Sequence, residues 1–139
     1  MKFEAIRKAL VQPLSSILEG FDLVYPNNKY ESKPDRNHAR IFIIMNQPTI
    51  STLGAGGYDE HTGILQVSLY TPKQRTDFPL LRAADQVEQT YQEFVRRSYL
   101  TSDGVNIRVT SIGVGASQSS DNWFFAPITI SYTTYIKGL

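Results

Sequence analysis

The chain has 139 residues, with 14 basic and 13 acidic side chains and no cysteine. The lack of cysteine excludes disulfides, thiolate nucleophiles and thiolate metal ligands. A net charge of +1 does not predict the concentrated basic surface that tight nucleic-acid binding requires. No apolar run approaches the ~20 residues that span a bilayer, and the N-terminus does not resemble a signal peptide. We therefore expect a product made in the cytosol, without a membrane partner.

The first third of the chain predicts a helix, a short strand and a loop. Apolar side chains recur at helical spacing over residues 2–19, and Pro13 predicts a kink or break because it lacks a backbone donor. Gly20 is a plausible stop, residues 21–25 read as a short strand, and residues 26–37 read as a polar loop. The residues of the expected helical face are Phe3, Ile6, Leu10, Leu14, Ile17 and Leu18.

Two strands are predicted around a glycine-rich connection. Residues 39–46 carry apolar side chains on both faces, Ile41, Ile43 and Met45 on one and Phe42 and Ile44 on the other. We expect both faces to be covered, by this chain or by a neighbour. Residues 64–70 alternate, with Leu65, Val67 and Leu69 directed to the core. The connection over 51–62 is expected to be a mobile loop.

The second half predicts a long helix and an antiparallel strand pair. Residues 78–97 form the helix, with Asp77 as its N-cap and Pro79 in its first turn. Its expected buried stripe is Leu80, Leu81, Ala84, Val87, Tyr91, Phe94 and Val95.

Residues 105–112 and 123–136 are the expected strand pair, joined by a flexible loop at 113–122. Pro127 predicts an edge position or an unpaired stretch in the last strand. The elements together predict one α+β domain over residues 1–139. Its sheet should be mixed, mainly antiparallel, with about four to five strands packed against two helices.

Several residue groups are candidate sites of chemistry. The segment Leu53–Gly57 is rich in glycine, but no Lys follows and the next element is a strand, so a flexible connection is favoured over a phosphate loop. Asp59, Glu60 and His61 are adjacent and cannot readily converge on one metal ion. The only other histidine is His38, so we expect a solvated turn at 59–61 and no metal site.

Catalysis and nucleic-acid stacking have little support in the sequence. The serines and the two histidines form no diagnostic nucleophile motif. The arginines are interleaved with acidic residues, which is typical of ordinary solvated charge. Tyr132 and Tyr135, with Trp123 and Phe125, could stack on bases, but aromatic residues in a strand are more often packing residues. We therefore expect no catalytic residue and no cofactor.

The order of the elements and four segments resemble the tail terminator proteins of long-tailed bacteriophages. The segments are Arg40–Ile43, Thr52–Gly57, Gly63–Tyr70, and Leu100–Arg108 leading to the strand at Trp123. The resemblance covers nearly the whole chain and contains no invariant chemical motif. Pro13 and the segment 26–37 have no clear counterpart in it.

The resemblance implies a structural virion protein that forms a ring, hexameric in this family. Such a ring caps the tail tube, ends its polymerisation and presents a surface to the head-completion or connector proteins. Its location would be the neck of the virion, after assembly in the host cytoplasm. The candidate assembly residues are Arg40, Phe42, Ile44, Leu53, Gly54, Gly56, Gly57, Trp123 and Phe125.

Three points stay open at the level of sequence. Another head-to-tail joining protein, such as a head-closure subunit, would show the same features. A small-molecule-binding or hydrolytic α+β domain is the alternative from another class. Whether DNA passing through the lumen of a ring would contact this chain non-specifically is also undecided.

Overall fold

The fold comes from a computed structural model, which describes residues 2–26, 36–51, 56–72, 78–96, 98–120 and 123–137. The helices are α1 (Lys2–Val11), α2 (Leu14–Ile17) and α3 (Phe78–Arg96). The strands are β1 (Phe21–Val24), β2 (Asn37–Met45), β3 (Thr49–Ile50), β4 (Tyr58–Pro72), β5 (Leu100–Ser102), β6 (Val105–Val114), β7 (Gln118–Ser120) and β8 (Trp123–Lys137). None of the helices in the described part of the chain is long and apolar enough to cross a membrane.

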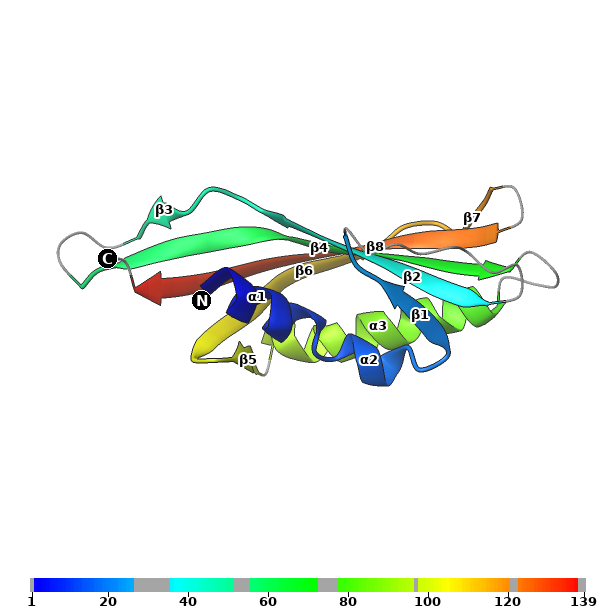
Figure 1. Cartoon of the computed structure of the whole chain (residues 1–139), viewed down its shortest axis with the longest axis horizontal. Helices are drawn as coiled ribbons and strands as arrows, with labels where there is room; N and C mark the ends of the chain where they lie inside the picture. The colour runs from blue at the N-terminus through cyan, green and yellow to red at the C-terminus, as the bar shows by residue number, and fades with distance from the viewer. Residues whose placement is uncertain are drawn as a thin grey trace.

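The described strands form one eight-stranded sheet in the order β1-β2-β4-β8-β6-β5, with β3 on β4 and β7 on β8. Only the β1–β2 pair is parallel. All three helices lie on one side of this twisted sheet (Figure 1). The α+β class is confirmed, but the predicted number of four to five strands is wrong. Strands β3, β5 and β7 have only two or three residues each, too few for an alternating pattern to show.

The described N-terminal segment over residues 2–26 folds as predicted, with one exception. Most of the predicted loop at 26–37 lies outside the described residues, and its last residue, Asn37, begins β2. The helical pattern breaks between α1 and α2 at Pro13, and α1 buries Ile6 and Leu10 completely. Phe3 is half exposed, although the spacing assigned it to the buried face. It lies in the second residue of α1, at the end of the helix, where it borders a surface groove instead of the core.

Strands β4 and β8 are the two longest, at 15 residues each, and pair along their whole length. Leu65, Val67 and Leu69 are buried as predicted. The strand starts at Tyr58, however, so the predicted loop at 51–62 is wrong over its last five residues. The pairing of 58–62 with 133–137 of β8 makes this segment a strand. His61 is consequently buried in β4 rather than in a solvated turn.

The segment 113–122 also differs from the predicted free loop. It contains β7, which continues in line with β6 along β8. Strand β8 is central, flanked by β4 and by β6 with β7, so the edge position predicted from Pro127 is wrong. The predicted unpaired stretch is present in part, because Pro127 faces the break between β6 and β7. On that side of β8 its carbonyl accepts a hydrogen bond from the N–H of Gly115.

Helix α3 covers the centre of the sheet over β4, β6 and β8. Its core residues Leu80, Ala84, Val87 and Tyr91 are buried, and the Tyr91 hydroxyl donates to the Leu10 carbonyl of α1. Leu81, predicted to be in the stripe, is exposed. Ala83, two residues further along the helix, is buried instead of Leu81. The predicted N-cap Asp77 lies outside the described residues.

Gly63 is the closest packing point of the central strands. A Cβ placed on it would lie 2.3 Å from the Ile44 carbonyl oxygen and 2.9 Å from Cε1 of Tyr132. Gly63 pairs directly with Met45 on β2 and with Tyr132 on β8. The Tyr132 ring occupies the space that a side chain at position 63 would need. The sheet therefore depends on glycine at this position.

Candidate assembly surface

One face of the sheet carries no helix. Side chains alternate between the two faces of a strand, and the helix-covered face has Ile41, Val67 and Ile128 on one cross-strand row. The next residues along each strand point to the other face, which we call the open face. All helices lie opposite to it (Figure 1).

An apolar patch occupies the β2 side of the open face. Phe42 is 52% exposed and Ile44 is 45% exposed. Ile44 pairs with the half-buried Ile64 of β4, so the patch extends across two strands. Phe42 instead meets Gln66 and, beyond it, Thr129. The apolar residues therefore lie beside polar side chains that can donate and accept hydrogen bonds.

Aromatic side chains occupy the end of the open face near the start of β2. His38 stacks on Tyr70 with ring centroids 4.6 Å apart and meets the Trp123 ring edge-on at 4.8 Å. Tyr70 stacks in turn on Phe125 at 5.6 Å. The Arg40 guanidinium lies over the Tyr70 ring at 5.9 Å. This row of rings crosses three strands. The register of the sheet brings the rings together, because His38, Tyr70 and Phe125 are direct cross-strand neighbours.

The rings around His38 remove it from water, with 2% of its surface exposed. This burial lowers its pKa below the ordinary value, and the positive charge of Arg40 lowers it further. The carboxylate of Asp22 opposes both effects but does not cancel them. His38 is therefore neutral in the folded chain at pH 7.

The buried, neutral His38 predicts a loss of stability in mild acid. Its folded-state pKa is below the unfolded value, so the unfolded chain binds the extra proton first, and stability falls as the pH drops below about 6.5. One such group contributes at most about 1.4 kcal/mol per pH unit. Urea denaturation at pH 7 and pH 5 should show a smaller acid loss in His38→Gln than in the natural chain. Equal losses in both proteins would contradict this prediction.

A second exposed apolar region lies where β4 and β8 extend past the helices with β3 (Figure 1). Ile50 is 70% exposed there, and Tyr58 and Tyr135 are about half exposed. The Tyr135 hydroxyl donates to the Glu60 carboxylate at 2.9 Å, which raises the pKa of the phenol. Gly56 leads into this extension with φ +84°, a conformation that favours glycine.

The open face brings together five of the nine candidate assembly residues. Arg40, Phe42 and Ile44 alternate along β2, and Trp123 and Phe125 stand on the same face of β8. Gly56 and Gly57 lie apart from them, at the start of the β4 extension. Leu53 and Gly54 lie outside the described residues.

A family profile described as "Phage tail terminator protein" matches residues 5–132. The chain belongs to this family. The resemblance to tail terminator proteins is thereby confirmed, and membership of this family supports a structural role in the virion tail.

The fold has a solved counterpart of nearly the same size. One structure, which bears no functional name, matches with a TM-score of 0.69 over 96% of this chain and 96% of its own. Sequence identity is 24%, so this match shows the fold alone. No curated protein matched the sequence significantly.

The described part of this tail terminator family member contains no group of three His, Cys, Asp or Glu side chains placed to hold a metal ion. Its two histidines lie on opposite faces of the sheet, since His38 precedes the core residue Ala39 while His61 shares the face of Leu65. They cannot act together on one ligand.

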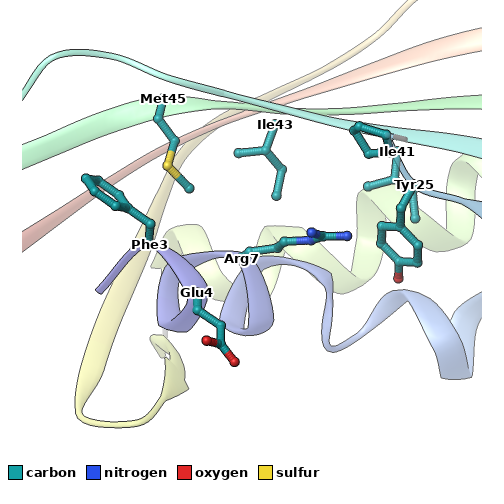
Figure 2. Close-up of a pocket in the computed structure, with 8 residues that line it drawn as sticks. Phe3, Glu4, Arg7, Tyr25, Ile41, Ile43 and Met45 are labelled. Atoms are coloured by element: carbon teal, nitrogen blue, oxygen red, sulfur yellow. The ribbon is translucent and has the colours of Figure 1, made fainter. Parts of the chain in front are cut away.

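Sequence reasoning missed two features of the surface. The aromatic row of His38, Tyr70 and Phe125 can be predicted only from the register of β2, β4 and β8, because these residues are far apart in the sequence. A groove of about 520 Å³ between α1 and β2 was also missed. Figure 2 shows Ile41, Ile43 and Met45 pointing from β2 toward α1, with Phe3 and Tyr25 at the two ends. Arg7 extends along the groove, and its guanidinium lies over the Tyr25 ring at 4.9 Å.

Proposed function

We propose that this chain, as one domain over residues 1–139, assembles into a hexameric ring that caps the tail tube. The ring ends tube polymerisation and then offers a docking surface to the head-completion or connector proteins. The chain acts without catalysis, cofactor or metal. Its place is the neck of the virion, reached after assembly in the host cytoplasm.

The observation that carries the proposal is the open face of the sheet in a member of the tail terminator family. Phe42 and Ile44 expose about half of their surface on an otherwise regular sheet. Contiguous exposed apolar side chains on one face are typical of protein interaction sites. A ring buries such surfaces between identical neighbours or against the tube, and it repeats one heterologous interface until it closes.

Removal of the gene from the phage genome tests this function. We expect cells infected with the deletion phage to accumulate filled heads and separate tails whose lengths vary widely, because no cap ends tube growth. Electron microscopy measures tail length, and the natural gene supplied on a plasmid should restore uniform, joined tails. Uniform tails that merely fail to join heads would favour a head-closure protein instead. Joined, infectious particles without this chain would exclude both roles.

A further inference from the structure

Two segments at opposite sides of the sheet have backbone groups that no described strand pairs. Strand β1 pairs with β2 only over residues 37–40, so no described strand pairs with Ile41–Met45 on that side. Strand β5 pairs with β6 only over residues 105–107, so the end of β6 also has no partner among the described strands on that side. We call Ile41–Met45 the β2 edge and Ser111–Val114 the β6 edge.

The two edges lie on the same cross-strand rows. Ile41 of β2 is joined through Val67 and Ile128 to Val114 of β6. Ile44 is joined through Ile64 and Ser131 to Ser111. The short strands β1 and β5 therefore cover opposite ends of the sheet and leave the same middle rows open on both sides.

The strand directions also match. Strands β2, β4, β8 and β6 are each antiparallel to the next, so β2 and β6 run in opposite directions. A second copy set beside the first with the same strand direction would bring its β6 edge antiparallel to the β2 edge. No slip along the strands is needed to align the rows.

Side chains at the two edges are complementary in character. The groove beside the β2 edge is walled by Ile41, Ile43 and Met45, and Figure 2 shows these three side chains directed into it. On the β6 edge, Val114 is 39% exposed and Ile112 is partly buried against the core. These two residues share rows with Ile41 and Ile43, and therefore share their face of the sheet.

We infer that the β2 edge of one subunit pairs antiparallel with the β6 edge of the next, with Ile44 opposite Ser111. This rests on the proposed ring. Main-chain hydrogen bonds hold the two edges, and Val114 of the incoming strand enters the groove. The bulge between Val109 and Ser111 sets the limit of the paired segment. Two unprotected edges, which would be aggregation hazards in a monomer, become one continuous sheet.

Cysteine pairs test this arrangement, because the natural chain has no cysteine. The Ile44→Cys/Ser111→Cys variant places thiols on two exposed positions of the open face. Directly opposite residues of an antiparallel pair have Cα atoms ~4.5–5.5 Å apart, within the range for a disulfide. The matched control is Ile44→Cys/Gln118→Cys. Gln118 is also exposed in the same line of strands, but its row is ~20 Å from that of Ile44.

The variants are oxidised both as purified chain at high concentration and in phage particles, and run on a non-reducing gel. We expect the 44/111 pair to give a ladder of multimers up to the full ring, which collapses with reductant. Each single variant and the 44/118 control should stay monomeric. Dimers from Ile44→Cys alone, or equal ladders from both pairs, would overturn the inference. Particles that contain a ring but give no ladder would also overturn it, while the proposed function would stand. Phage particles that do not contain the chain would contradict both the edge pairing and the proposed function.

Discussion

The Phe42→Asp/Ile44→Asp variant should fold normally and fail to complete tails. Both residues expose about half of their surface, so the purified subunit tolerates acidic side chains with little change in unfolding free energy. In an assembly that covers the open face, two carboxylates lose water without partners, and central interface residues commonly cost 2 kcal/mol or more each. Two such losses correspond to a reduction in assembly of roughly 10³-fold.

Complementation of a deletion phage measures this effect as the yield of infectious particles. The matched control is Leu81→Asp/Tyr99→Asp, which makes the same kind of change at two exposed apolar residues away from the open face. We expect the control to complement nearly as well as the natural chain. Full complementation by the Phe42/Ile44 variant, with normal folding of both proteins, would show that the open face is not an assembly surface.

The Gly63→Val variant should lose several kcal/mol of unfolding free energy. Any Cβ at this position overlaps the Ile44 carbonyl at 2.3 Å, and a backbone oxygen in a paired strand cannot move without breaking the ladder. Overpacking in a well-packed site typically costs 1–3 kcal/mol. The branched side chain of valine must also displace the Tyr132 ring, so we expect at least about 3 kcal/mol.

Urea denaturation of the purified chain measures this loss, with Gly113→Val as the control. Nothing lies within 4 Å of a Cβ at Gly113, and valine suits a strand. The control should therefore be neutral or slightly stabilising. Equal stability of the two variants would mean that β2 and β8 can move apart at Gly63 without cost.

The long elements could be predicted from the sequence because their patterns repeat. Helix α3 and strand β8 each span several periods of apolar alternation, and the break at Pro13 has a purely local cause. Segments that owe their structure to a distant partner could not be predicted in this way. His61 looks like a turn residue beside glycines and acidic side chains, yet pairing with Thr134 of β8 makes it a buried strand residue.

The candidate assembly surface could likewise be predicted only where it depends on local sequence pattern. The placement of Arg40, Phe42 and Ile44 on one side of β2 could be predicted from the sequence, since it depends only on the two-residue period of a strand. The alignment of the β2 and β6 edges was not, because it depends on the register of three separate strand pairs. Single-residue shifts in any of them would have moved Ile44 off the row of Ser111.

The separation of β4 and β8 in the sequence affects how the chain folds. These strands form the middle of the sheet, but α3, β5, β6 and β7 lie between them in the sequence. During synthesis β4 can pair with β2, which precedes it, but its other edge has no β8 to pair with until the end of the chain is made. Contacts that distant in sequence make folding slow. The complete sheet needs β8 between β4 and β6, so we expect a subunit to present its whole open face and both edges to a neighbour only after β8 is in place.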